Sequence, residues 1–237
     1  MSKIIGMSRN INMDWLNETA NLILSDKSEL EVKEALNEYL RFSITSPTNL
    51  RKTREILMNI WVRTEDKNAK LKELALNLYN TNKSSNRIVA HWCMMLLAYP
   101  VFGDIVTAIG KMADKQFDIT TAQVKTRMFD VWGERSTLYH SIDKNIKTLK
   151  DIGALGTIKT GLYKVESFNI EEERAITLIV ATLLTLKDKL YMRLDELESS
   201  YEFYLFKYEV DLESLQMSEL FSFDKFGGEV VISNRNN

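Results

Sequence analysis

A group of basic and polar residues lies in the middle of the chain, between Arg127 and Lys164. Arginine and lysine bind phosphate through charge-assisted hydrogen bonds, and serine and histidine can add further hydrogen bonds. The segment from Lys115 to Val165 holds 9 Lys/Arg and 5 Asp/Glu, a net charge of +4. These residue types indicate contact with a polyanion. The candidate contacts are Arg127, Arg135, Ser136, His140, Lys144, Lys147, Lys159 and Lys164.

Three helices and a hairpin are expected to position these side chains. Hydrophobic spacing and capping patterns predict helices over residues 101–112, 120–132 and 136–152, with a short extended link at 118–120. Gly133 and Gly153 end the second and third helices. Two short apolar runs, 155–159 and 162–165, flank a Thr160-Gly161 turn and predict a β-hairpin. This order is typical of a winged helix-turn-helix, in which the hairpin is the wing.

The third helix would face the ligand. An α-helix fits the major groove of DNA, and a helix-turn-helix places its second helix there. At about 100° per residue, the face opposite the predicted core stripe holds Ser136, His140, Asp143, Lys144, Lys147 and Asp151. We therefore expect double-stranded DNA as the partner. The alternative is that the segment contacts only protein, because a fold does not fix a function.

A second basic group begins another predicted helix. Ser46-Pro47 starts a helix over Thr48–Val62, and its first half carries Arg51, Lys52 and Arg54. One interpretation is a second patch that contacts phosphate. The other is a solvated helix face, which is the usual role of a basic triplet.

The sequence as a whole predicts a mainly α protein in three segments: an N-terminal helical bundle (1–99), the winged helix (100–168) and an acidic, helical C-terminal segment (169–237). Residues 1–12 are expected to form a loose start of the chain. The polar run 80–86 is expected to be a linker. The helix over Arg87–Tyr99 is apolar nearly all round, so it should lie centrally in the core. On it, His91 is expected to be a hydrogen-bonded core residue rather than a ligand.

The C-terminal segment is strongly acidic. Residues 166–237 carry 7 Lys/Arg and 15 Asp/Glu, a net charge of −8, which would repel DNA. It should lie away from the DNA-binding face or contact another protein. A hydrophobic stripe predicts one long helix over Ala175–Leu197 that continues to about Tyr208. A Gly227-Gly228 turn precedes a predicted terminal strand at Glu229–Ser233.

Residues for catalysis are scarce. The chain has 2 His and 1 Cys, and it contains no phosphate-binding loop, serine-nucleophile motif or metal-ligand spacing. We therefore expect no enzyme activity, no cofactor and no metal. Cys93 cannot form an internal disulfide. No signal peptide is visible and the apolar runs are shorter than the ~20 residues of a membrane span, which favours a cytoplasmic protein without a membrane partner.

Several short motifs resemble the small A component (BrxA) of bacteriophage-exclusion (BREX) defence systems. They span about Ser46 to Val165, roughly half of the chain. The residues that carry the resemblance are Ser46-Pro47 with Arg51 and Arg54, Leu97-Ala98-Tyr99-Pro100 with Phe102 and Asp104, Trp132 with Arg135, and Leu149 with Ile152-Gly153. Leu220-Phe221 with Phe223 is a weaker match.

The resemblance implies a helical N-terminal part similar to antitermination-factor bundles and a winged helix that binds double-stranded DNA. It also implies a non-enzymatic role beside a DNA methyltransferase and an ATPase in phage resistance. The acidic C-terminal third departs from that family. Two other functions remain open: a protein-interaction scaffold and a winged-helix transcriptional regulator. The oligomeric state, the preferred DNA sequence and the protein partners stay undetermined.

Overall fold

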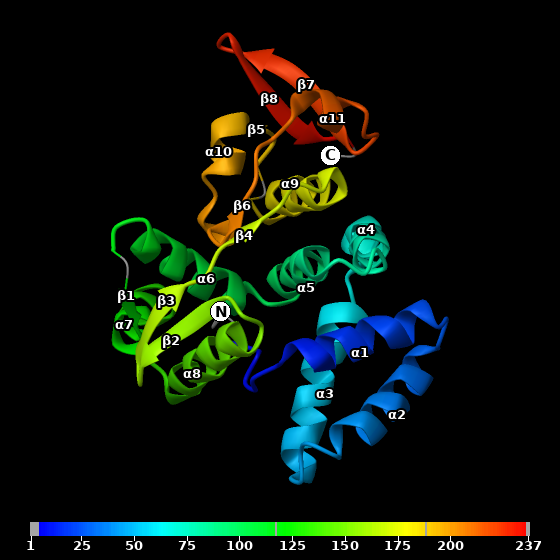
Figure 1. The fold of residues 1–237 in the computed structure, drawn as a ribbon, viewed down its shortest axis with the longest axis vertical. Helices are drawn as coiled ribbons and strands as arrows, with labels where there is room; N and C mark the ends of the chain where they lie inside the picture. The colour runs from blue at the N-terminus through cyan, green and yellow to red at the C-terminus, as the bar shows by residue number, and fades with distance from the viewer. Residues whose placement is uncertain (1–4, 117, 188, 236–237) are drawn as a thin grey trace.

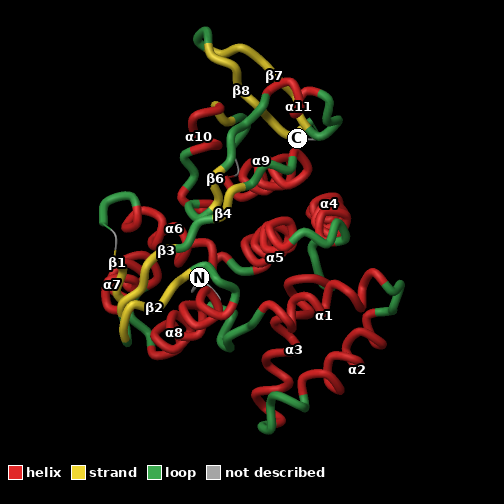
Figure 2. The backbone as a smooth tube through the Cα atoms, in the orientation of Figure 1, coloured by secondary structure: helices red, strands yellow, loops and turns green. Residues whose placement is uncertain are grey.

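The computed structural model describes residues 5–116, 118–187 and 189–235. Helices make up most of this part of the chain, and three small sheets complete it (Figures 1 and 2). The mainly α class predicted from the sequence is confirmed. Within the described ranges, no single helix is long and apolar enough to cross a membrane. Two helices, over Ser84–Ala98 and Pro100–Ala113, pass that test only as a pair bent by 118°.

Five helices form the N-terminal part: α1 (Met13–Leu24), α2 (Glu29–Leu40), α3 (Pro47–Trp61), α4 (Ala69–Tyr79) and α5 (Ser84–Ala98). A 3-10 helix, η1 (Asp66–Asn68), precedes α4. The predicted central helix is confirmed, since ten of the residues of α5 are buried. It begins at Ser84 rather than Arg87, so the predicted linker 80–86 is wrong in its last three residues. Burial of Asn86 beside Thr81, to whose hydroxyl its amide donates, draws this polar stretch into the helix.

His91 is a core residue, as predicted. Its Nδ1 accepts a hydrogen bond from Trp61 Nε1 at 3.1 Å, so Nε2 carries the proton and donates to Asn17 Oδ1 at 3.0 Å. Burial removes the hydration of the charged imidazolium, and the nearby positive charge of Arg87 adds to this effect, so the pKa of His91 is lowered to about 3. The imidazole is therefore neutral and fully hydrogen-bonded.

The middle part contains the predicted three helices and hairpin. Its elements are α6 (Pro100–Ala113), β1 (Asp118–Thr120), α7 (Thr121–Trp132), α8 (Ser136–Asp151), β2 (Leu155–Lys159) and β3 (Leu162–Val165). The strands pair antiparallel in the order β1-β3-β2. Thr120 and Gln123 form the predicted capping box at the start of α7. Gly133 ends that helix at a φ of +75°, which suits a residue without a Cβ.

The C-terminal part is less regular than predicted. Its elements are β4 (Phe168–Asn169), α9 (Glu173–Lys187), β5 (Met192–Arg193), α10 (Leu194–Glu198), η2 (Tyr201–Phe203), β6 (Phe206–Lys207), α11 (Leu212–Gln216), β7 (Phe221–Phe226) and β8 (Glu229–Asn234). The single helix predicted to reach Tyr208 is wrong. Leu190 is exposed, and Met192 instead pairs with Ile232 of β8. The terminal strand is confirmed as β8, and β7 had not been predicted.

One hydrophobic core joins the three segments predicted at 1–99, 100–168 and 169–237. Trp92 of α5 shows the connection. Its ring packs edge-on against Phe102 of α6 and Phe206 of β6. Its Nε1 donates a 2.9 Å hydrogen bond to the carbonyl oxygen of Glu202 in η2. The middle part is therefore held on a common core with the rest of the chain.

The start of the chain is fixed rather than loose. Residues 5–12, here called the N-terminal strap, run along α8, whereas residues 1–4 lie outside the described residues (Figure 1). Met7 and Ile11 are buried. The hydroxyl of Thr148 accepts the Ile11 N–H at 2.9 Å, and Asn145 Nδ2 donates to the Met7 carbonyl at 3.3 Å. The prediction of a loose start is wrong for this segment because buried polar side chains of α8 bind its backbone.

Candidate nucleic-acid interface

One face of α8 presents the polar stripe predicted from the sequence. Ser136, His140, Lys147 and Asp151 are exposed. Lys144 and Asp143 are half-buried at the edges of the stripe. The opposite face packs into the core through Leu138, Ile142, Ile146 and Leu149. The helical periodicity thus places these polar side chains together on one surface.

The edge of the stripe towards α7 is formed by Lys125. Its Nζ lies 2.7 Å from Asp143 Oδ1 and 3.3 Å from the centre of the Tyr139 ring. Only 12% of the Lys125 side chain is exposed. Phe129 stacks on the same tyrosine, with ring centres 6.5 Å apart. Lys125 therefore locks α7 against α8 and offsets the negative charge of Asp143.

The other edge of the stripe is formed by the N-terminal strap. Asn10 Nδ2 donates a hydrogen bond to Asp151 Oδ2 at 3.4 Å. Both carboxylates of the stripe therefore have partners. Among the described residues, Lys144 and Lys147 form no ion pair, so no carboxylate of this part of the chain cancels their charges. The stripe can attract an anion despite its two aspartates.

The hairpin and the turn before α8 carry the other cations predicted in this region. Lys159 is exposed next to the turn between β2 and β3, and Arg127 is exposed on α7. Lys164 pairs with Glu166 at 3.0 Å, yet 57% of its side chain stays exposed. Arg135 is half-buried, and its Nη2 donates to the Trp132 carbonyl at 3.3 Å. Arg135 therefore supports the turn between α7 and α8, whereas the other three point outward.

The second basic group separates into two kinds of residue. Arg51 and Lys52 are exposed on α3. Arg54 is 11% exposed and donates to Asn37 of α2 at 2.8 Å and to Glu55. Burial alone would raise the pKa of Glu55, but hydrogen bonds from Arg54 and Arg63 outweigh it and hold that pKa below its ordinary value. Arg54 thus belongs to a network of charges between α2 and α3.

Lys125 and Arg9 help to build this region and were not among the sequence candidates. Lys125 positions α7 and α8, as described above. Arg9 lies on the N-terminal strap, where its Nε donates to Asn49 Oδ1 of α3 at 3.0 Å. No local pattern marks either residue, because each gains its place from a partner in another element.

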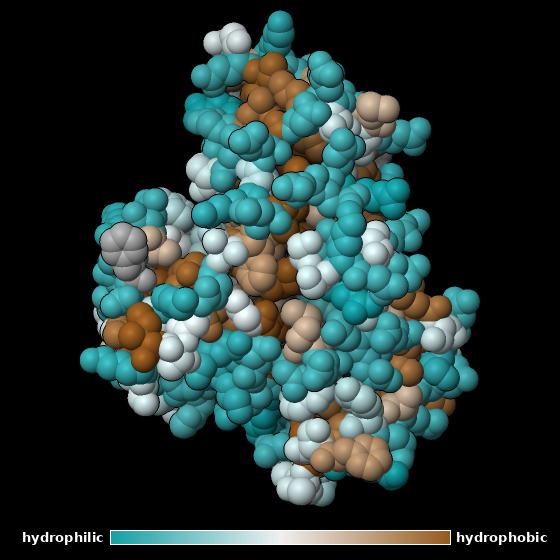
Figure 3. Space-filling view, in the orientation of Figure 1, coloured by the Kyte–Doolittle hydropathy of each residue, from teal (hydrophilic) through white to brown (hydrophobic). Residues whose placement is uncertain are grey.

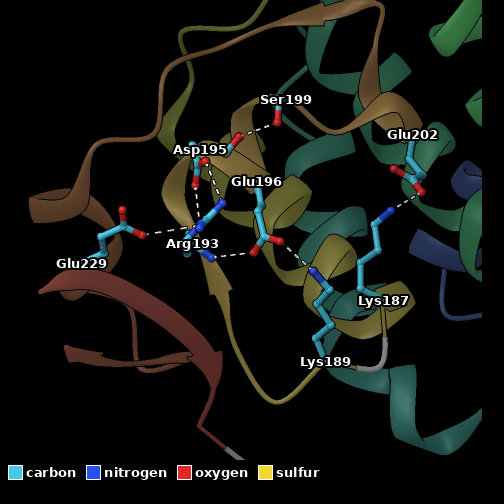
Figure 4. A network of polar contacts seen from close by, with 8 residues as sticks. All are labelled: Lys187, Lys189, Arg193, Asp195, Glu196, Ser199, Glu202 and Glu229. Carbon is cyan, nitrogen blue, oxygen red and sulfur yellow. Dashed lines mark hydrogen bonds and ion pairs between the residues drawn. The ribbon is translucent and has the colours of Figure 1, made fainter. Parts of the chain in front are cut away.

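The C-terminal part holds a separate polar network beside an open hollow of about 690 Å³ (Figure 4). Arg193 lies 3.1 Å from Asp195 and 3.6 Å from Glu229, and Lys189 lies 2.7 Å from Glu196. A further pair, Lys187 with Glu202 at 2.6 Å, lies nearby. These cations are matched by carboxylates, so they are not a second anion-binding surface. Within the described ranges, no three His, Cys, Asp or Glu side chains are grouped to hold a metal ion.

The α8 stripe, the β2–β3 hairpin and the strap form the strongest candidate site in the described residues. The C-terminal sheet β5-β8-β7 lies at the far end of the molecule from α8 and the β2–β3 hairpin (Figure 1). In comparisons with known proteins, no protein-family model, no curated protein and no solved structure matches the chain.

Proposed function

We propose that the chain binds double-stranded DNA through the exposed face of α8 and the β2–β3 hairpin, in the manner of a winged helix. The order α6-β1-α7-α8-β2-β3 and the sheet order β1-β3-β2 support this fold assignment. The observation that carries the proposal is the charge state of the stripe. Lys125 and Asn10 engage its two aspartates, while half-buried Lys144 and exposed Lys147 form no ion pair with any described residue.

The candidate residues of α7, α8 and the hairpin would either reach base edges or bind phosphates. Ser136 and His140 lie near the start of α8, the part of a recognition helix that reaches base edges. Lys144, Lys147 and Arg127 bind phosphates beside the groove. Lys159 and Lys164 on the hairpin bind the backbone where the wing meets the duplex. Because most of these contacts reach phosphate, the proposal predicts little preference for sequence.

The proposed biological role is that of a non-enzymatic accessory protein in a BREX phage-defence system, alongside a DNA methyltransferase and an ATPase. This role rests on the motif resemblance alone. It is tested by co-purification of the tagged chain with those two proteins from its native host. If the methyltransferase and the ATPase co-purify with each other but neither co-purifies with the tagged chain, the proposed role is wrong. The DNA-binding proposal is unaffected by that result.

The scaffold alternative loses one of its two supports, because the described residues after α9 form short separate elements rather than one long helix. The acidic charge remains, and hydrophobic surface gathers near the C-terminal hairpin at the top of Figure 3. On the C-terminal part, the large hydrophobic side chains of Leu190, Met217 and Phe226 are exposed. Contact with a protein at that end is compatible with DNA binding by α8.

The test measures the affinity of the purified protein for a fluorescent random-sequence duplex at about 50 and 200 mM salt. Wild type should bind, and log K should fall linearly with log salt at about −0.9 per phosphate contact. Lys144→Glu/Lys147→Glu should abolish binding. The matched control is Lys70→Glu/Lys225→Glu, which makes the same charge change at exposed sites on α4 and β7 and should bind like wild type.

Three results would overturn the proposal. They are no binding by wild type, binding that ignores salt, and equal losses in the two double variants. Circular dichroism confirms that every variant is folded. An RNA duplex of the same sequence is the competitor, and preference for it would replace DNA by RNA as the ligand.

A further inference from the structure

The N-terminal strap connects α8 to the first turn of α3. On one side, Ile11 N–H donates to the Thr148 hydroxyl at 2.9 Å, and Asn10 donates to Asp151. On the other side, Arg9 Nε donates to Asn49 Oδ1 at 3.0 Å. In Figure 1 the strap passes between α8 and the helices α1 and α3. Arg9 therefore lies at the junction of two helices whose contacting residues, Asn49 and Thr148, are 99 positions apart in sequence.

The strap is held firmly enough to position a side chain. Met7 and Ile11 are buried on its inner side. Ser141 Oγ lies 3.2 Å from the Gly6 carbonyl oxygen and donates to this turn of the strap, and Asn145 donates to the Met7 carbonyl. Buried backbone groups with satisfied hydrogen bonds seldom leave their partners. The position of Arg9 is thus set by the interior face of α8.

The guanidinium of Arg9 is held by neutral partners. Its Nε donates to Asn49 and its Nη1 donates to the Ser8 carbonyl at 2.5 Å. Arginine has five N–H donors, so three remain after these two bonds. Within the described residues, Arg9 forms no ion pair, and its charge is not cancelled by a carboxylate. This combination leaves a positioned cation able to bind an oxyanion.

Further cations lie on either side of Arg9. Lys144 is four residues before Thr148 on α8, so it lies on the same side of that helix as the strap. Lys52 is three residues after Asn49 on α3, so it lies about one turn beyond the residue that Arg9 contacts. Arg51 is two residues after Asn49 and points about 160° away from it around the helix. The line of cations therefore runs from Lys144 through Arg9 to Lys52 and excludes Arg51.

We propose that Arg9 binds a phosphate of the DNA held by α8, and that the DNA-binding surface continues across the strap to Lys52. This inference rests on the proposed DNA-binding function and extends its footprint beyond the winged helix to the N-terminal helices. Arg9 and Lys52 read no bases in this arrangement. They add sequence-independent affinity and fix the direction in which the duplex leaves α8.

The test compares the salt dependence of duplex binding for wild type, Arg9→Gln, Lys52→Gln and Arg51→Gln. Arg9→Gln and Lys52→Gln should each reduce the log–log slope by about 0.9. Each should weaken binding about eight-fold at about 0.1 M salt, as follows from one lost phosphate contact. Arg51→Gln is the matched control, because it removes the same charge one residue away and should leave the slope unchanged. Arg9→Lys should restore most of the slope.

The outcomes separate this inference from the function on which it rests. No binding by wild type overturns both. Binding by wild type that is lost in Lys144→Glu/Lys147→Glu but is unchanged in slope in Arg9→Gln overturns the inference alone. Equal slopes for Arg9→Gln and Arg51→Gln overturn it as well. Weaker binding by Arg9→Gln with an unchanged slope and a lowered melting temperature also overturns it, because that result shows a structural effect of the strap.

Discussion

Lys125 of α7 lies over the ring of Tyr139 of α8, with Nζ 3.3 Å from the ring centre and 2.7 Å from Asp143. The cation is nearly buried, so the aromatic face and the carboxylate replace much of its lost hydration. This arrangement does two things at once. It fixes the angle between α7 and α8, and it removes a negative charge from the surface proposed to bind DNA.

Replacing Lys125 by methionine should separate these two effects. Lys125→Met keeps much of the apolar stem, so the loss of stability should be small, about 1 kcal/mol from the cation–π contact. DNA affinity should fall several-fold because Asp143 is left unpaired on the DNA-binding face. The second change in Lys125→Met/Asp143→Asn removes that charge and should restore affinity without restoring stability. Duplex binding and thermal unfolding of the three proteins check this, and a double variant that binds no better than Lys125→Met would contradict it.

The hydrogen bond from Ile11 N–H to Thr148 predicts a specific loss of stability. Thr148→Val preserves shape but removes the acceptor, which leaves a buried N–H without its partner. The expected cost is about 1–3 kcal/mol in the free energy of unfolding. Thr126→Val is the control, since Thr126 is exposed on α7 and should change stability by less than about 0.5 kcal/mol. Urea unfolding measures both, and equal effects would show that the hydrogen bond from Ile11 to Thr148 adds nothing to stability.

Sequence patterns predicted the elements of residues 100–165 because their signals are local. Thr120 with Gln123 and the turn glycine Gly133 each act within four residues. The strap and the break after α9 depend on distant partners instead. Thr148 binds Ile11 across 137 positions, and Met192 pairs with Ile232 across 40. Periodicity carries no information about such pairs.

The residues of the candidate site also divide into those placed by a local pattern and those placed by contacts with distant elements. Helical spacing placed His140, Lys144 and Lys147 on one exposed face of α8, since the core side of that helix was clear from its hydrophobic residues. It could not distinguish Arg54 from Lys52, because their difference arises from the position of α2 against α3. It could not identify Arg9 either, because the strap that holds this residue has no periodic pattern of its own.

The buried His91 predicts a pH dependence of stability. Its pKa is about 3 in the folded protein and 6.5 in the unfolded chain. Between these values the unfolded state binds the proton and the folded state does not. The contribution of neutral His91 to the free energy of unfolding is therefore fully present above about pH 6.5. It is lost as the pH drops towards 3, by up to about 1.4 kcal/mol per pH unit. Protonation in the folded state would set a new N–H at Nδ1 against the Trp61 N–H.

Urea unfolding of wild type and His91→Gln at pH 7, 5.5 and 4.5 checks this dependence. The variant is expected to be less stable at pH 7, because glutamine fits the Trp61 and Asn17 hydrogen bonds poorly. Its loss of stability between pH 7 and 4.5 should nevertheless be smaller than that of wild type. The carboxylates titrate in both proteins, so the difference between the two slopes isolates His91. Parallel slopes would show that the histidine does not resist protonation.

Close packing at Gly110 predicts opposite effects for two glycines of α6. A Cβ at Gly110 would lie 2.7 Å from the Tyr201 carbonyl oxygen and 2.9 Å from Tyr204 Cβ, so Gly110→Ala must push α6 away from η2. We expect a loss of about 1–3 kcal/mol, which exceeds the gain in helix propensity. A Cβ at Gly103 would meet only Leu96 at 3.7 Å. Gly103→Ala should therefore stabilise the protein by up to about 1 kcal/mol. Thermal unfolding of both variants checks this. A raised melting temperature for Gly110→Ala would mean that η2 does not pack against α6 as closely as described, and a lowered one for Gly103→Ala would contradict the open space at that position.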